Sequence, residues 1–320
     1  MYGDRLHFSS STFLSRFILL LLTGLSLFFY HDYTRREAFY NVYIHNELVN
    51  FTGVEDFIPP FINIVSDLFV APEYKIAACG IRKSMSQLTI NTMCLLYDTE
   101  SFKNNQQSMN DTWKTQGACG YYDENFRKLP DTLKNDRDLT RIAFIRDPFD
   151  RFISFYLDKC LREKNCWRCD SMLCVVKSLY HELKRFKVHR DYKPTYIEMH
   201  AAPLSWNCDF DTELSKYNLF MMGANTEERR SSILHLANIL TSKNVPKDMI
   251  HMIVDGSLNG ETDHSTHKSS KRLEVENMVR NDPVIREYLH KIYFYDYLIF
   301  NFNREVLDAK YQTDFWKTQL

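Results

Sequence analysis

The sequence contains little glycine and little proline, with nine residues of each among 320. Collagen-like and low-complexity chains are rich in these residues, so the composition excludes both classes. We also find no internal repeat. Charge of one sign does not dominate, because 40 lysines and arginines face 41 aspartates and glutamates. A chain with a net charge of −1 is not a general binder of polyanions, although a local basic cleft is still allowed.

Two chemical signatures are missing as well. No segment follows the pattern Gly-x-x-x-x-Gly-Lys-Ser/Thr, which the phosphate-binding loop of a phosphoryl-transfer enzyme requires. No carboxylate cluster indicates a metal site, and Cys166-x-x-Cys169 lacks the second cysteine or histidine pair of a zinc finger. We therefore expect no metal and no nucleic-acid partner.

What the chain does contain fits a globular core, with 44% hydrophobic and 14% aromatic residues. A length of 320 residues is enough for one large domain with appendages. An even number of cysteines in an oxidising compartment indicates disulfides, although the sequence does not give their connectivity. We interpret the cysteine-rich segment after residue 160 as a disulfide-stapled insertion, with a zinc or redox site as the alternative. The eight cysteines are Cys79, Cys94, Cys119, Cys160, Cys166, Cys169, Cys174 and Cys208.

An uncharged apolar run occupies residues 17–30 and follows Arg16. With residues 13–15 it makes about 18 residues interrupted only by Arg16, which is near the lower limit for a membrane-spanning helix. A cleavable signal peptide is the alternative, but bulky residues stand where a small-x-small cleavage site would follow. We therefore predict an uncleaved signal anchor. The predicted organisation is a short cytosolic tail at 1–12, a transmembrane anchor at 13–31, a stem at 32–70 and a luminal domain at 71–320.

Two glycosylation sequons support an orientation with the large domain in the lumen. Asn50-Phe51-Thr52 and Asn110-Asp111-Thr112 both lie downstream of the apolar run. Positive charges do not decide the orientation, because two arginines stand on each side of the run. We expect a single-pass type II membrane protein.

Short apolar runs that fit buried strands alternate with longer segments of helical periodicity. This alternation predicts an α/β fold with a mainly parallel central sheet. Residues 98–138 are polar and form a long excursion between two of these units. The predicted strands are 74–79, 141–145 and 217–223, and the predicted helices are 82–97, 148–162, 171–187, 227–240 and 283–302.

The segment 141–156 carries the most information. A β-branched and aromatic run ends at Arg146, and Asp147-Pro148 has the form of a helix cap followed by a proline at the first helical position. Arg146 is then at the carboxyl end of a strand, and Ser154 projects from the helix that follows. Ligands of open α/β sheets bind at that edge. A guanidinium, a helix amino end and a hydroxyl together form a receptor for phosphate. The alternative is an arginine that pairs with a surface carboxylate.

A second segment, 75–84, has three cations around a predicted strand, a tight turn and a helix amino end. The cations are Lys75, Arg82 and Lys83, and Ser84 follows them. Turn amides and these side chains can hold an anion, as phosphate-binding loops do. An ordinary basic helix start explains the same pattern.

The pattern Arg-Asp-Pro-Phe-x-Arg-x-x-Ser-x-Tyr at 146–156 resembles the 3′-phosphate-binding segment of Golgi carbohydrate sulfotransferases, which use 3′-phosphoadenylyl sulfate (PAPS) as donor. Segment 75–84 resembles the 5′-phosphosulfate loop of that family, with departures. Cys79 stands where threonine is usual, Ile81 replaces tryptophan, and no proline directly precedes Lys75. The resemblance implies the three-layer sulfotransferase fold, related to that of nucleotide kinases. The departures leave weakened cofactor binding or lost activity open.

The resemblance also implies roles for individual residues at the two ends of the donor. Arg146 and Ser154 would hold the 3′-phosphate of PAPS. Lys75, Arg82 and Lys83 would stabilise the charge that develops during transfer, with Lys83 counted as catalytic and Ser84 as a hydrogen-bond donor. The resemblance requires no metal.

A sugar hydroxyl must lose its proton during transfer, so a general base is expected. His200 is the first candidate, because Glu198 to Cys208 resembles the His-x-x-Pro…Cys region of the family, although Ala201 stands where an aromatic residue is common. A structural histidine beside a disulfide is the alternative interpretation, and Glu198 is a weaker candidate base.

A third family-like stretch runs from Asp263 to Ser270 and is rich in hydrogen-bond donors. It resembles a loop that closes over the anionic cofactor, with His267, Lys268 and Ser269 as cofactor-binding candidates. A flexible surface loop explains the composition as well.

These observations predict a PAPS-dependent carbohydrate O-sulfotransferase of the Golgi membrane. Its acceptor would be a hydroxyl of a chondroitin-like glycosaminoglycan or of a glycoprotein glycan. Two alternatives stay open, namely a catalytically inactive glycan-binding protein with the same fold and a protein-tyrosine sulfotransferase.

Overall fold

The computed structural model describes residues 56–111, 124–188, 193–222, 226–259, 269–300 and 302. All of them belong to a unit that runs from Phe51 to Leu320. No helix in these ranges is long and apolar enough to cross a membrane. The predicted anchor at 13–31 and the cytosolic tail lie outside the described residues.

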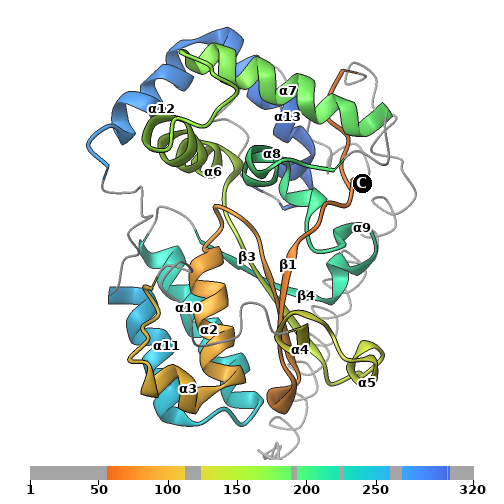
Figure 1. Ribbon diagram of the computed structural model, residues 1–320, viewed down its shortest axis with the longest axis vertical. Coiled ribbons are helices and arrows are strands. Elements are labelled where there is room, and N and C mark those ends of the chain that lie inside the picture. Colours follow the sequence, from red (N-terminus) through yellow and green to blue (C-terminus); the bar gives the residue numbers. More distant parts are fainter. Residues whose placement is uncertain are drawn as a thin grey trace, which may run out of the picture. The chain divides into compact units, whose positions relative to one another are not determined.

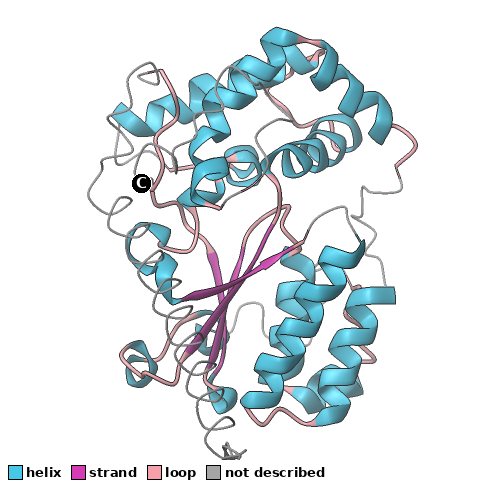
Figure 2. Cartoon of the chain, turned by 180° about the vertical axis from the view of Figure 1, so that it is seen from behind, coloured by secondary structure: helices cyan, strands magenta, loops and turns pink. Residues whose placement is uncertain are grey.

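The described chain contains a four-stranded sheet with the order β1-β2-β3-β4 (Figures 1 and 2). β1 pairs antiparallel with β2, whereas β2–β3 and β3–β4 are parallel. The predicted α/β class is therefore confirmed as helices with a mixed sheet, and the three-layer order and the kinase likeness stay predictions. The strands are β1 (Asp67–Ala71), β2 (Ile76–Gly80), β3 (Thr140–Ile145) and β4 (Tyr217–Met221).

Strand β1 lies almost wholly in the range that the sequence assigned to the stem. It pairs along its full length with β2, from Asp67 opposite Gly80 to Ala71 opposite Ile76. Even residues near 59 contact the body of the domain, because the indole Nε1 of Trp206 donates to the carbonyl of Pro59 at 2.7 Å. The sequence-based boundary at residue 71 therefore cuts through the sheet. Five residues that begin with an aspartate give too short an apolar pattern to reveal a strand.

One face of the sheet is covered by helices α2, α10 and α11, which pack together below the carboxyl ends of the strands (Figure 1). Their apolar side chains join Ala78 of β2, Phe144 of β3 and Phe220 of β4 in a large buried cluster. Alternation along β2 directs Ala77 and Cys79 to the opposite face, where Ala77 contributes to a smaller cluster. The sheet is thus buried on both faces at its centre.

A second group of helices lies beyond the carboxyl ends of β2 and β3 (Figure 1, top). It is held together by contacts of α13 with α6, α7 and α12, and of α8 with α6 and α7. The predicted core helix near the C-terminus is confirmed as α13, which is buried along most of its length. The helices of this group are α6 (Pro148–Phe155), α7 (Met172–Val188), α8 (Tyr196–Ala201), α12 (Arg272–Asn281) and α13 (Pro283–Ile299).

The remaining helices are short or lie against the sheet. They are η2 (Pro72–Tyr74), α2 (Ser86–Tyr97), α3 (Thr99–Asn104), α4 (Glu124–Arg127), α5 (Asp131–Lys134), η4 (Tyr156–Arg162), η5 (Leu204–Trp206), α9 (Phe210–Glu213), η6 (Leu214–Lys216), α10 (Thr226–Ser242) and α11 (Lys247–Asn259). Three of them, α3, α4 and α5, occupy the range 98–138 that the sequence marked as an excursion.

Helix α6 begins as the sequence predicts. A carboxylate oxygen of Asp147 accepts hydrogen bonds from the amides of Phe149 and Asp150, at 2.9 and 3.3 Å, and Pro148 is the first helical residue. The helix then widens into the π-helical segment η4. This wider turn brings Asp158 and Lys159 to buried positions, and such π-turns are frequent at functional sites.

Candidate functional site

The candidate site lies at the carboxyl ends of β2 and β3, which are adjacent parallel strands. The turn of residues 81–85 connects β2 to α2, and Lys83 and Met85 in it have positive φ angles of 65° and 59°. A side chain with a Cβ atom adopts this conformation rarely, and functional sites are enriched in it. The helix therefore begins at Ser86 rather than at Arg82, and the cations predicted for its first turn belong to the connection.

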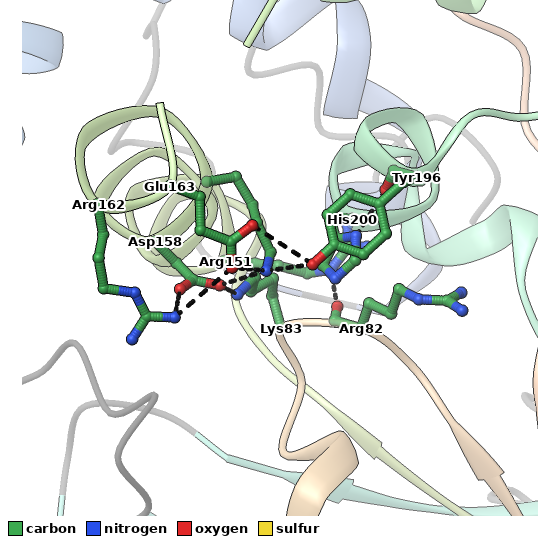
Figure 3. Close-up of polar contacts among 9 residues, drawn as sticks. Arg82, Lys83, Arg151, Asp158, Arg162, Glu163, Tyr196 and His200 are labelled. Atoms are coloured by element: carbon green, nitrogen blue, oxygen red, sulfur yellow. Dashed lines mark hydrogen bonds and ion pairs between the residues drawn. The ribbon is translucent and has the colours of Figure 1, made fainter. Parts of the chain in front are cut away.

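Lys83 points into the interior, where its ammonium contacts the carboxylate of Asp158 (Figure 3). Its side chain is 10% exposed, and burial lowers the pKa of Lys83 to about 8 against the opposite effect of Asp158. Asp158 is 1% exposed and also contacts Arg162 and, at 3.0 Å, the ammonium of Lys159. Three cations therefore share one buried carboxylate.

Arg82 points the other way, away from the Asp158 cluster (Figure 3). Its guanidinium lies 3.3 Å from the carboxylate of Asp67 on β1. The hydroxyl of the next predicted residue, Ser84, is buried and has no hydrogen-bond partner in the described part of the chain. The turn therefore directs Arg82 and Lys83 to opposite sides (Figure 3) and also carries the buried hydroxyl of Ser84.

Lys75 is not brought to this group. It directly precedes β2, at the opposite end of the strand, and its ammonium forms ion pairs with Asp136 at 2.9 Å and Asp138 at 3.4 Å. A five-residue strand spans about 16 Å. The cations beyond the carboxyl end of β2 are Arg82 and Lys83, in the turn of residues 81–85, so the structure separates Lys75 from the other two predicted cations.

Arg146 follows the last residue of β3, as predicted. Its Nε is buried and has no hydrogen-bond partner among the described residues. Burial and the neighbouring Arg272 lower the pKa of Arg146, whereas Asp150 favours its charged form. The described residues show no ion pair for Arg146, so they do not show the surface-carboxylate alternative. Ser154 is buried in α6, one helical turn beyond Asp150.

His200 lies in α8, and its Nδ1 is 2.6 Å from the carbonyl oxygen of Tyr196. A carbonyl only accepts, so Nδ1 carries the proton and Nε2 keeps a lone pair. Burial lowers the pKa of His200 to about 2, and the nearby charges of Lys83, Lys159 and Arg82 act in the same direction. The imidazole is therefore neutral, which is the form that a proton acceptor needs.

Tyr196 and Lys159 fix the surroundings of this histidine, and the sequence analysis missed both. The ring of Tyr196 packs against His200 with centroids 4.3 Å apart. The ammonium of Lys159 lies 2.5 Å from the Tyr196 hydroxyl and 2.6 Å from Glu163. The signal that the sequence offered was the charged pair Asp158-Lys159 just after the motif.

Arg151 joins the two halves of the site. It is 1% exposed, and its guanidinium donates to the carbonyl of Arg82 at 3.0 Å and to that of Ala202 at 2.5 Å. The disulfide Cys79–Cys208 is a second link between the end of β2 and the segment that follows His200. The turn after β2 is therefore tied to the segment that carries the candidate base. The sequence motif contains Arg151 but gave it no role.

Two residues of α13 hold the segment after His200. The hydroxyl of Tyr293 donates to the carbonyl of Ala201 at 2.7 Å. The buried carboxylate of Asp296 accepts from the amides of Leu204 and Ser205, at 2.6 and 2.9 Å. These bonds fix the end of α8 from behind.

The other predicted site residues lie at the margin of what the structure describes. Glu198 is buried and completes a capping box with Thr195, so its carboxylate has a structural partner. His267 and Lys268 lie outside the described residues. Ser269 is described, and its carbonyl accepts from the amide of Arg272 at 3.0 Å, just before α12.

The cysteine-rich segment is a disulfide-stapled insertion, as predicted. Cys160 pairs with Cys166, and Cys169 pairs with Cys174. These sulfur atoms are therefore bonded to each other, and the zinc interpretation of Cys166-x-x-Cys169 was wrong. No cluster of metal-ligating side chains occurs in the described ranges.

Comparison with known proteins identifies the family. A profile described as "Sulfotransferase family" matches residues 66–303. The C. elegans protein named carbohydrate sulfotransferase chst-1 is 36% identical over 268 residues, which cover 79% of this chain and 80% of that protein. An uncharacterised C. elegans protein is 30% identical over 257 residues, or 77% of this chain and 71% of that one. No solved structure matches the chain. With a matching profile over most of its length and a named relative of this similarity, the chain belongs to the sulfotransferase family.

Proposed function

We propose that this protein transfers a sulfonate group from PAPS to a hydroxyl of a glycan. The observation that carries the proposal is the site at the ends of β2 and β3, where cations and a neutral histidine meet. Lys83 and Arg146 follow neighbouring strands, and the pKa of His200 responds to the charge of Lys83. Membership of the sulfotransferase family supports the reaction class, and the name of one relative supports a carbohydrate acceptor.

The residues at this edge fit an anionic donor. Ser84 Oγ, Arg146 Nε and Arg151 Nη2 are buried and find no partner in the described ranges. A buried donor that finds no acceptor lowers the free energy of unfolding by about 1–3 kcal/mol. A bound anion would accept from these groups and remove that cost. Arg146 and Ser154 would hold the 3′-phosphate, and the turn with Arg82, Lys83 and Ser84 would hold the phosphosulfate.

The donor supplies the sulfonate. The bond between its sulfur and the bridging phosphate oxygen breaks as the acceptor oxygen bonds to sulfur. The leaving group is PAP, the desulfated nucleotide. The ammonium of Lys83 stabilises the negative charge that grows on the bridging oxygen. Nε2 of His200 takes the proton of the acceptor hydroxyl, because Nδ1 is engaged with Tyr196. An anion bound beside Lys83 offsets the cations that lower the pKa of His200, so the base gains proton affinity when the donor is in place.

The acceptor class and the compartment complete the proposal. We expect a chondroitin-like glycosaminoglycan or a glycoprotein glycan, modified on the luminal side of the Golgi membrane. The three disulfides among the described residues support folding in an oxidising compartment.

The test is incubation of the purified protein with labelled PAPS and a panel of acceptors. The panel contains desulfated chondroitin, dermatan and heparan, a glycopeptide and a tyrosine peptide. We expect label on a glycan, and we expect His200→Ala to lower kcat about 10²-fold or more while PAP affinity is kept.

Each alternative has its own outcome. Tight PAP binding with no transfer to any acceptor would indicate an inactive binding protein. Label on the tyrosine peptide alone would indicate a protein-tyrosine sulfotransferase. A protein that binds no PAP would contradict the proposal as a whole.

A further inference from the structure

Arg272 is the first residue of α12, and its side chain is only 13% exposed. Two of its nitrogens are engaged, Nη2 with the carboxylate of Asp150 on α6 and Nε with Glu276 at 2.7 Å. Its third nitrogen, Nη1, is buried and has no hydrogen-bond partner in the described part of the chain. The sequence analysis assigned no role to this arginine.

Arg272 is close enough to Arg146, at the end of β3, to affect its charge. Asp150, which contacts Arg272, favours the charged form of Arg146, whereas the charge of Arg272 lowers its pKa. Arg146 also keeps a buried Nε without a partner among the described residues. The end of β3 and the start of α12 therefore each carry an arginine with a buried N–H group that has no partner among the described residues.

Helix geometry places Ser154 in this region too. Asp150 and Ser154 are four residues apart in α6, so their side chains lie on one face of the helix, one turn from each other. Because Arg272 contacts Asp150, it covers the face of α6 that carries Ser154. The three side chains come from the end of β3, from α6 and from the start of α12.

A purely structural role for Arg272 does not account for these contacts. A tether between α12 and α6 needs the bonds to Asp150 and Glu276, but it needs neither a third buried nitrogen nor a second arginine beside it. Two nearby positive charges repel each other, which is why Arg272 lowers the pKa of Arg146. A phosphate dianion would offset this repulsion. Its oxygens would also accept hydrogen bonds from the unpartnered guanidinium nitrogens.

We propose that Arg272 is a further binding residue for the phosphate monoester of the donor nucleotide, the 3′-phosphate of PAPS. The proposal rests on the function proposed above and adds α12 to the donor site. Asp150 is a positioning residue, because it holds Arg272 against the face of α6 on which Ser154 lies. The phosphate is then held by elements on two sides, Arg146 from β3 and Arg272 from α12.

The test measures binding of two nucleotides to the full-length protein by calorimetry. PAP carries the 3′-phosphate, and adenosine 5′-phosphosulfate lacks it. We expect Arg272→Ala to weaken PAP binding about 10-fold or more and to change binding of adenosine 5′-phosphosulfate less than about twofold. Arg272→Lys keeps the charge beside Asp150 without the planar fork, so it should lie between the wild type and Arg272→Ala.

The matched control is Arg280→Ala, in the same helix. Arg280 is exposed and lies over the ring of Phe149, 4.9 Å from its centroid. Its removal takes the same charge from α12 and should leave the affinity for both nucleotides unchanged. Thermal unfolding of each variant shows whether α12 still packs, and Arg272→Lys serves as the test variant if Arg272→Ala does not fold.

The outcomes separate this inference from the proposed function. The role of Arg272 is overturned if Arg272→Ala lowers the affinity for both nucleotides equally, or if it lowers neither affinity. If Arg146→Ala loses its preference for PAP while Arg272→Ala keeps it, the proposed donor site stands and only this inference fails. A wild-type protein that binds neither nucleotide overturns both.

Discussion

The turns that follow β2 and β3 differ in how their cations are paired. After β2, each cation already has a carboxylate of the protein, Lys83 with Asp158 and Arg82 with Asp67. After β3, Arg146 keeps a buried nitrogen without a partner among the described residues. To bind an anionic ligand, the cations of the first turn must leave a carboxylate of the protein. Arg146 can bind such a ligand without breaking an ion pair among the described residues.

This difference separates chemistry from binding. A buried ammonium that leaves Asp158 for a ligand trades one charged partner for another, so it gains little net affinity. The same ammonium gains much in the transition state, when charge grows on the oxygen beside it. The turn after β2 should therefore control the rate, and the turn after β3 should control affinity for the nucleotide.

Removal of Lys83 is the strongest test of this division. We expect Lys83→Ala to lower kcat about 10²–10³-fold, the usual effect of removing one donor that stabilises developing charge. The affinity for PAP should fall much less. Steady-state kinetics with labelled PAPS, together with PAP titration, separate the two quantities. Equal losses in kcat and in PAP affinity would contradict the assignment of Lys83 to the chemical step.

Removal of Arg146 should give the opposite pattern. We expect Arg146→Ala to weaken PAP binding about 10–100-fold, because a charge-assisted hydrogen bond contributes about 1.5–3 kcal/mol. At saturating PAPS the variant should keep most of its kcat. The conservative Arg146→Lys should recover part of the affinity but not the two-pronged geometry. A variant that saturates normally with PAPS but turns over slowly would remove the distinction between the turns.

The pH dependence sharpens the same contrast. With a pKa of about 8, Lys83 loses its proton as pH rises through that value, so kcat should fall up to tenfold per pH unit above it. Arg146 stays charged in that range, so its contribution to binding is kept. The folded-state pKa of Lys83 lies below its ordinary value, so its cost to folding is present at neutral pH. Between about pH 8 and about pH 10 that cost is relieved, and the free energy of unfolding rises.

The measurement is kcat from about pH 6.5 to about pH 9.5 for the wild type and Lys83→Arg. The arginine variant should have a flat profile above pH 8, whatever its absolute rate. If kcat falls equally above about pH 8 in both proteins, the group that titrates is not Lys83.

The smallest expected effect comes from the carboxylate that Lys83 contacts. Asp158→Asn removes the charge that competes with a bound anion, so PAP affinity should rise a few-fold, about the difference between a charged and a neutral partner. The same change leaves Lys83, Lys159 and Arg162 facing a neutral side chain and should lower the melting temperature. PAP titration and thermal unfolding check both expectations. Weaker PAP binding would mean that Asp158 orients Lys83 rather than competes for it.

The sequence predicted the part of the site that local rules determine. A capping aspartate, a proline at the first helical position and an apolar repeat predict where β3 ends and where α6 begins, because these signals act within a few residues. Arg146 and Ser154 were placed correctly on that unit, although their roles stay predictions. The helix after β2 was also recognised, but with the wrong start.

The parts that sequence analysis missed depend on long-range contacts or rare backbone states. The positive φ of Lys83 moves the start of α2 to Ser86, and no residue type in that turn announces it. The π-helical turn that buries Asp158 has no periodic signature. Arg272 becomes part of the site only through Asp150, which is 122 residues away in the chain.

The guanidinium of Arg151 mechanically couples two regions that are far apart in the sequence. It bonds at once to the carbonyl of Arg82, in the turn after β2, and to the carbonyl of Ala202, just after His200. Because one buried side chain makes both bonds, a shift of either region disturbs the other. The proposed donor turn and the proposed base would therefore move as one unit, and their separation would be kept when outer loops rearrange.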